Sequence, residues 1–143
     1  MAKGSNMEQI INSRHKCRIY DKSIGEMCYD VCIGFIKDGI TKDCVIADTS
    51  CGQITYIDKR LNDIEIMQCT GLKDINGIFI YEGDIVKFGN ELLGKPKQIE
   101  WDECHYILKD TFIILCNMEI KQFNLEVIGN RFENPELIKE LQQ

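Results

Sequence analysis

The sequence predicts a mainly β protein that ends in one short α-helix. Three observations lead to this prediction. From residue 16 onward, short runs rich in Val, Ile, Tyr, Phe and Cys alternate with turn signals that contain Gly, Asn or Asp. Some of these runs alternate polar and apolar residues, which is typical of half-buried strands. The last segment has the residues that begin a helix, followed by an apolar stripe. Strands at this spacing with one terminal helix indicate a small barrel or sandwich.

The first half of the chain is predicted to contain five short strands. Its clearest turn signals are Lys22–Gly25 and Lys37–Gly39, and the glycine of the second can adopt the positive φ that tight turns need. A further loop is expected at Thr49–Gly52. The expected strands are residues 16–20, 27–36, 44–47, 54–57 and 64–70.

The second half opens on the strongest turn signal in the chain, Asp74-Ile75-Asn76-Gly77. Asn-Gly tolerates the left-handed conformations of a tight hairpin. A second turn is expected at residues 82–84, and a loop from residue 89 to residue 97, which holds two glycines and a proline. The expected strands are residues 85–88, 98–101, 106–108, 111–116 and 121–132, the last with Phe123, Leu125 and Val127 at period two.

The C-terminal segment has the chemistry of a helix start. We expect the Asn134 side chain to cap the backbone amides that open the helix. Pro135 suits the first helical position, and Glu136 lies at the positive end of the helix dipole. The apolar residues that follow form one stripe, Leu137, Ile138 and Leu141. A short amphipathic helix that docks on the sheet is therefore predicted.

Length and hydropathy limit the organisation of the chain. Its 143 residues and 16.5 kDa fit one ordinary domain or two very small ones. The longest apolar run is residues 112–116, whereas a membrane span needs about 20 residues, so no span is expected. We interpret MAKGSN as an expression scar, and residues 1–14 as a scar or disordered leader. A β-rich N-terminal portion is expected at 15–70, followed by a C-terminal portion at 71–143 that either stands alone or is integrated with it.

The net charge of −6 argues against sequence-independent binding to nucleic acid, which depends on neutralising phosphates. Residues 38–86 alone carry nine acidic and four basic side chains. The one basic stretch lies at residues 14–22 and is smaller than the basic face that such binding usually needs. We interpret it as a solvated strand edge.

The eight cysteines are expected to be reduced and free of metal. No two have the C-x-x-C spacing of a zinc site. The first residues lack the apolar core of a signal peptide, which favours a reducing cytoplasm. A structural metal and a disulfide framework are the alternatives. Cys104 and His105 are neighbours, and neighbours in a strand point to opposite faces, so a nucleophile–base pair is not expected there. No cofactor is expected.

Four stretches together carry a resemblance: HKCRIYDKSIGEM (15–27), MQCTGLKDINGIFIYEGDIVKF (67–88), EVIGNRF (126–132) and ENPELI (133–138). In order and spacing they resemble the YopX family of phage and prophage proteins. The resemblance implies a C-terminal SH3-like small β-barrel and a β-rich N-terminal portion. It also implies carriage by a phage or an integrated element. It supplies no biochemical activity and so no catalytic residues.

Two pairs of carboxylates lie in predicted turns: Glu82 with Asp84, and Asp102 with Glu103. Side chains in turns are expected to be solvated. We therefore expect no enzyme. The favoured hypothesis is a non-enzymatic interaction module that binds a phage or host protein and can self-associate through sheet edges. An accessory nucleic-acid-binding protein of phage replication, recombination or regulation is the alternative, and an undetected enzyme a third.

The 67–88 and 126–132 motifs supply the candidate partner surface, although the favoured interpretation is that they mark the fold rather than a site. Its residues are Lys73, Asp74, Asn76, Tyr81, Glu82, Asp84 and Asn130.

Overall fold

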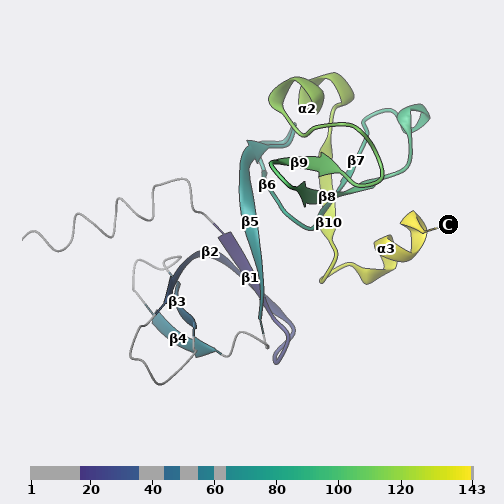
Figure 1. Cartoon of the computed structure of the whole chain (residues 1–143). Helices are drawn as coiled ribbons and strands as arrows, with labels where there is room; N and C mark the ends of the chain where they lie inside the picture. The colour runs from purple at the N-terminus through teal and green to yellow at the C-terminus, as the bar shows by residue number, and fades with distance from the viewer. Residues whose placement is uncertain (1–16, 36–43, 49–54, 60–63, 143) are drawn as a thin grey trace, which may run out of the picture. The chain divides into compact units, whose positions relative to one another are not determined.

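The computed structural model describes residues 17–35, 44–48, 55–59 and 64–142, with the backbone alone described from residue 30 to residue 59 (Figure 1). The expected leader at residues 1–14 lies outside these ranges, as do the predicted turns at 37–39 and 49–52. The chain divides into two compact units, Met1–Gln68 and Cys69–Gln143. No helix in the described ranges is long and apolar enough to cross a membrane.

The first unit is an antiparallel sheet with the order β4-β3-β2-β1-β5. Its strands match the five predicted from the sequence, and no strand end differs from the predicted one by more than three residues. Asp21 organises the β1–β2 turn, because its carboxylate accepts a bond from the Ser23 N–H (2.9 Å) while its carbonyl accepts one from Gly25 (2.8 Å). The strands are β1 (Cys17–Asp21), β2 (Glu26–Phe35), β3 (Cys44–Asp48), β4 (Thr55–Lys59) and the first part of β5 (Ile64–Lys73).

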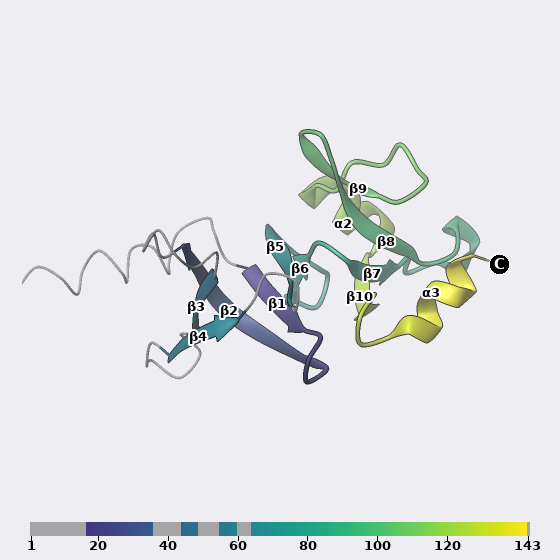
Figure 2. The ribbon, with the colours of Figure 1, turned by 60° about the horizontal axis from the view of Figure 1, so that its bottom comes forward.

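The second unit contains a four-stranded antiparallel sheet with the order β10-β7-β8-β9 (Figures 1 and 2). The end of β5 pairs with β6, through Cys69 with Tyr81 and Lys73 with Phe79. The remaining elements of this unit are β6 (Phe79–Tyr81), β7 (Asp84–Lys87), the 3-10 turn η2 (Glu91–Leu93), β8 (Lys97–Asp102), β9 (His105–Leu108), α2 (Asn117–Phe123), β10 (Glu126–Asn130) and α3 (Pro135–Leu141).

Each unit has its own apolar cluster. In the first, Cys17, Ile19 and Ile64 pack together from β1 and β5. In the second, aliphatic side chains and one phenylalanine from β6, β7, β8, β9, α2 and the adjoining loops converge, which removes most of their apolar surface from water. This larger core consists of Ile80, Val86, Phe88, Ile99, Leu108, Leu115, Ile120 and Leu125. The mainly β class with a short C-terminal helix is thus confirmed, whereas closure into an SH3-like barrel stays a prediction.

Both borders of the four-stranded sheet carry hydrogen bonds to neighbouring loops. At the β10 border, the carbonyl of Leu125, just before the strand, accepts a bond from the Ile75 N–H (3.1 Å), and the Val127 N–H of β10 donates to Asp74 (3.0 Å). On β9, the Leu108 N–H donates to the Ile113 carbonyl (3.0 Å), and the Tyr106 carbonyl accepts a bond from Leu115 (2.8 Å). Loops therefore occupy the positions where a further strand would pair.

The strand predicted at residues 121–132 is wrong in its first part. Residues 117–123 form helix α2, which buries Ile120 and packs Phe123 against the same core. Asn124 ends the helix in the left-handed conformation (φ 48°) and donates its N–H to the Lys121 carbonyl (3.4 Å). The apparent alternation of Phe123 with Leu125 and Val127 thus joins the end of a helix to the start of β10.

The strand predicted at residues 111–116 is also wrong. Only Ile114 forms a bridge, to Ile107 of β9. Thr111 reverses the chain instead, because its hydroxyl donates to the Leu108 carbonyl (2.6 Å) and accepts a bond from the Ile113 N–H (3.1 Å). A threonine that bonds its own loop in this way competes with strand pairing.

Helix α3 begins at Pro135, as the sequence predicts, but its expected side-chain cap is wrong. Asn134 makes no such hydrogen bond to the first helical turn. Its side-chain oxygen instead accepts a bond from the Asn130 N–H (3.1 Å), and its own N–H donates to the Asn130 carbonyl (3.0 Å). Asn134 therefore ties the helix start to the end of β10.

Candidate partner surface

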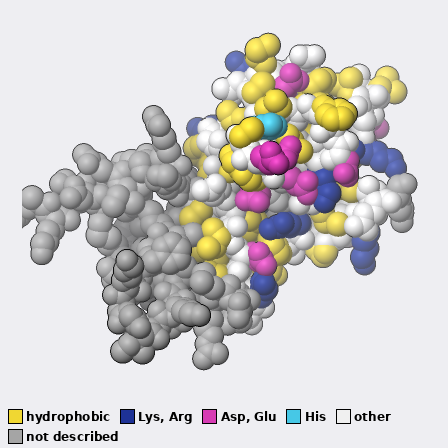
Figure 3. Space-filling model, viewed as in Figure 1, with side chains coloured by type: hydrophobic (Ala, Val, Ile, Leu, Met, Phe, Trp, Pro, Cys, Tyr) yellow, Lys and Arg dark blue, Asp and Glu magenta, His cyan; other side chains and the backbone are white. Residues whose placement is uncertain are grey.

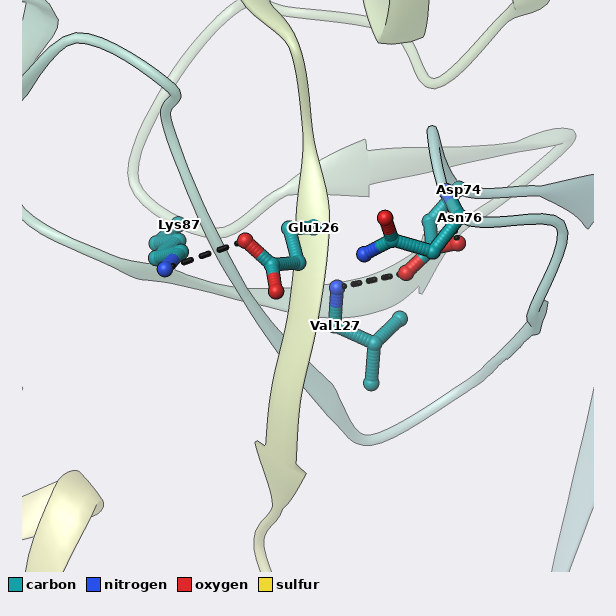
Figure 4. A network of polar contacts seen from close by, with 5 residues as sticks. All are labelled: Asp74, Asn76, Lys87, Glu126 and Val127. Atoms are coloured by element: carbon teal, nitrogen blue, oxygen red, sulfur yellow. Dashed lines mark hydrogen bonds and ion pairs between the residues drawn. The ribbon is translucent and has the colours of Figure 1, made fainter.

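Asp74 holds the turn that follows β5. One carboxylate oxygen accepts bonds from the N–H groups of Asn76 (2.8 Å) and Ile78 (2.9 Å). The other accepts a bond from the N–H of Val127 on β10 (3.0 Å), 53 residues further along the chain (Figure 4). The carboxylate is buried, so each of these amides would lose its partner if the side chain were removed. We call this set of bonds the Asp74 latch.

An ion pair lies next to the Asp74 latch. Lys87 of β7 and Glu126 of β10 are direct cross-strand partners, and their charged groups lie 3.0 Å apart (Figure 4). Both side chains remain about a third to a half exposed. The surface of the sheet beside the Asp74 latch is therefore in contact with solvent. Exposed ion pairs contribute little to stability.

Asp84 has a similar role at the second turn of the motif. Its carboxylate is only 1% exposed and accepts a bond from the Tyr81 N–H (2.8 Å). Gly83 adopts φ 83° between them, and its carbonyl accepts a bond from Arg131 (3.0 Å). The expectation that Asp84 is a solvated turn residue is therefore wrong, since the side chain organises buried backbone.

Asn130 closes β10. Its buried side-chain oxygen accepts bonds from the N–H groups of Phe132 (3.0 Å) and Glu133 (2.9 Å). Its side-chain nitrogen donates to the Glu133 carboxylate (2.7 Å). These bonds fix the turn that leads into helix α3.

The seven predicted surface residues therefore divide into two groups. Asp74, Tyr81, Asp84 and Asn130 are buried and serve the backbone. Lys73 and Asn76 are exposed, and Glu82 is half-buried. Lys73 places its ammonium group 4.7 Å from the centre of the Phe79 ring, which is the geometry of a cation–π contact. Only this second group is accessible to a partner.

A set of exposed hydrophobic residues between residues 101 and 118 was not predicted from the sequence. Phe112 is fully exposed and Met118 is 74% exposed. Trp101 and Ile114 are about half exposed, and the Trp101 ring meets the Tyr106 ring edge to face at 4.9 Å. We call Trp101, Phe112, Ile114 and Met118 the exposed hydrophobic set. Apolar residues are usually expected in the core. Phe112 and Ile114 lie outside it because residues 111–116 form no strand, whereas Trp101 of β8 and Met118 of α2 lie on the solvent side of regular elements.

Cys104 and His105 are closer than expected. The Cys104 sulfur lies 3.0 Å from His105 Nδ1. The expectation that they point apart is wrong because Cys104 lies in the turn after Glu103 (φ 49°), where strand alternation does not apply. Cys104 and Cys116 are free thiols. In the described ranges, no three His, Cys, Asp or Glu side chains are placed to hold a metal ion together.

One titratable group beside this turn has an altered pKa. Partial burial raises the pKa of the Tyr106 phenol, and the negative charges of Glu82 and Cys69 raise it further. The Glu82 carboxylate therefore lies near enough to the Tyr106 phenol on β9 to affect its ionisation.

Gly77 allows a direct test of the latch turn. Its φ is 80°, and a Cβ atom there would meet nothing within 4 Å. Gly77→Val should therefore cost only backbone strain, about 1–2 kcal/mol of unfolding free energy in urea titration. The neighbouring Asn76→Ala change, at an exposed residue without positive φ, should stay within about 0.5 kcal/mol. Equal losses for the two variants would contradict this account of the turn.

The fold and the described side chains define a small β protein of two units, in which the most distinctive polar residues hold turns. The chain belongs to the YopX family, because the family model described as YopX protein matches residues 16–139. The structure is similar to the crystal structure of protein EF1440 from Enterococcus faecalis, with a TM-score of 0.64 and 27% identity over 86% of this chain and 96% of that one.

A second solved structure, protein yopX from Bacillus subtilis, has a TM-score of 0.59 and 17% identity, covering 87% of this chain and 96% of the other. At that identity the likeness shows the fold alone. No curated protein sequence matches the chain. The resemblance found in the sequence motifs is thereby confirmed.

Proposed function

We propose that the protein is a non-enzymatic protein-interaction module, carried by a phage or prophage and acting in the bacterial cytoplasm on a phage or host protein. The exposed hydrophobic set is the observation that carries this proposal. Aromatic residues and methionine are enriched where proteins bind one another, and burial of such side chains supplies most of the energy of binding. Water contact costs this set free energy that a partner would recover.

The location of the exposed hydrophobic set supports the same proposal. Trp101 lies on β8, Phe112 and Ile114 lie in the loop after β9, and Met118 lies on α2. All four belong to the unit with the larger core. Loops held on a rigid frame are where binding residues are commonly found. On the face shown in Figure 3, hydrophobic side chains lie among acidic and basic ones, with no broad basic area. This mixture favours a protein partner over a phosphate backbone.

The accessory nucleic-acid-binding role is the second candidate. One observation favours it: exposed Trp101 and Phe112 are rings on which bases could stack. The second unit nevertheless contains 13 acidic and 8 basic residues, which opposes the approach of a polyanion. A protein partner therefore remains the stronger proposal.

The test compares three forms of the tagged protein expressed in a bacterium that carries the intact phage. They are wild type, the Phe112→Ser/Met118→Ser double variant, and Leu92→Ser as the matched control. Leu92 is 93% exposed but lies in η2, outside the exposed hydrophobic set. Thermal melting should show all three folded, because none of these side chains is buried. Quantitative mass spectrometry of cross-linked complexes then measures partner recovery.

We expect one protein to be recovered with wild type and with Leu92→Ser, and its affinity in a direct binding assay to fall about tenfold or more in the double variant. Equal binding by all three forms would contradict the role of the exposed hydrophobic set. Tight, steeply salt-dependent binding to single-stranded nucleic acid in fluorescence anisotropy would instead favour the second candidate.

A further inference from the structure

The latch turn contains a reactive pair of residues. Of the nine asparagines in the chain, Asn76 is the one followed by glycine. The backbone nitrogen of the next residue can attack the asparagine side-chain carbon, which forms a five-membered succinimide and expels ammonia. Water then opens the ring to aspartate or isoaspartate. The reaction needs no other reactant, and glycine hinders the attack least because it has no Cβ.

The surroundings of this pair leave the reacting groups open. Asn76 and Gly77 are both exposed. The space on the Cα side of Gly77 is open, because a Cβ atom there would meet nothing within 4 Å. Water can therefore reach the Asn76 side chain and the succinimide that would form.

The backbone bonds of the turn oppose the reaction. The Gly77 N–H donates to the Asp74 carbonyl (3.0 Å), so the attacking nitrogen is held toward Asp74. The Asn76 N–H donates to the Asp74 carboxylate (2.8 Å), which fixes the backbone on the other side of the side chain. Attack requires the Gly77 nitrogen to lose its proton and turn toward the Asn76 side chain. The native turn has to open first, as in local unfolding.

From this arrangement we infer that Asn76 is a self-modification site whose conversion to aspartate or isoaspartate is controlled by the Asp74 latch. Either product places a carboxylate at an exposed position of the predicted partner surface. Isoaspartate also adds one methylene to the main chain, which alters the spacing between Asp74 and Ile78 on which the latch depends. Modification would thus change surface charge and loosen the tie to β10 in one step.

The experiment measures isoaspartate formation at residue 76 in the full chain. Wild type and Asp74→Asn are incubated at mildly alkaline pH, each in native buffer and in concentrated urea. Asparagine at 74 can still accept bonds from Asn76 and Ile78, but its amide group then faces the Val127 N–H as a second donor. This variant therefore removes the tie to β10 while retaining the local turn. Peptide mass spectrometry and enzymatic isoaspartate methylation quantify the product.

In wild type we expect the native rate to be at least about tenfold lower than the rate in urea, because the open turn is a minor population. In Asp74→Asn the native rate should rise while the rate in urea stays equal to that of wild type. Equal native and denatured rates in wild type would overturn control by the latch, and no isoaspartate in urea would overturn the site itself.

Native-state hydrogen exchange keeps the test decisive if Asp74→Asn fails to fold. The Gly77 amide of wild type should exchange slowly, and its opening should become more frequent in low urea together with isoaspartate formation. A Gly77 amide that exchanges as fast as one in an unfolded peptide would contradict the inference. Gly77→Ala hinders the attacking nitrogen and should lower the rate in urea. This control shows whether the isoaspartate that is measured forms at residue 76.

Discussion

Replacing Asp74 by alanine is expected to lower the free energy of unfolding of the second unit by about 2 kcal/mol or more. The Val127 N–H is left without its acceptor, at roughly 1–3 kcal/mol, while the amides of the exposed Asn76 and Ile78 each lose a hydrogen bond worth about 0.5–1.5 kcal/mol. Three N–H groups lose the acceptor that the Asp74 latch supplies. The Val127 bond matters most, since it joins the latch turn to a strand 53 residues away. Loss of that bond also frees one border of the sheet.

The fluorescence of Trp101 allows the stability of the second unit to be measured. Trp101 is the single tryptophan of the chain and lies on β8, so its fluorescence reports unfolding of the second unit. The matched control is Asp102→Ala, which removes an exposed carboxylate from the last residue of β8 and should change stability by no more than about 0.5 kcal/mol. A similar small change for Asp74→Ala would mean that the latch contributes little.

Gly89→Ala is expected to lower the free energy of unfolding by about 1–3 kcal/mol, because the added methyl group overpacks this site. A Cβ atom there would lie 2.5 Å from the Asn124 Cβ and 3.3 Å from the Asn124 carbonyl oxygen. Both atoms belong to or lie next to the backbone, so no side-chain rotation relieves the clash. The Gly89 N–H also donates to the Phe123 carbonyl (2.9 Å), which prevents the two segments from separating freely.

A double variant separates this clash from other effects of the methyl group. Asn124→Gly removes the nearer clashing atom, and glycine suits the left-handed φ of 48° at that position. Gly89→Ala combined with Asn124→Gly should therefore recover most of the lost stability in urea titration monitored by Trp101. An additive or larger loss in the double variant would show that the contact is not the cause.

Local chemistry was sufficient to predict most strands and turns. The β1–β2 turn, the latch turn and the start of α3 at Pro135 all follow from residues within a few positions of one another. Helix α2 was not predicted, because Phe123 and Leu125 have the spacing of a strand although Asn124 adopts a left-handed conformation between them. Asparagine is one of the few residues that readily ends a helix in that conformation, but the period-two pattern around it favoured extended backbone.

The candidate site was less accessible to sequence reasoning because its decisive contacts are long-range. Asp74 was recognised as a turn residue, but its bond to Val127 depends on how β10 returns to the latch turn. The motif residues drew attention to polar side chains of which four proved buried. Phe112 and Met118 were missed for the opposite reason: apolar residues near a predicted strand are expected inside, and tertiary structure left them in water.

The loops that occupy the borders of the four-stranded sheet have a consequence for behaviour at high concentration. Residues 74–75 bond β10 and residues 113–115 bond β9, so neither strand offers a free row of amides as a template for amyloid-like growth. Self-association of this unit would instead have to proceed through side chains. Opening the latch removes that protection on the β10 side, so a loosened turn would expose a nucleus for fibres.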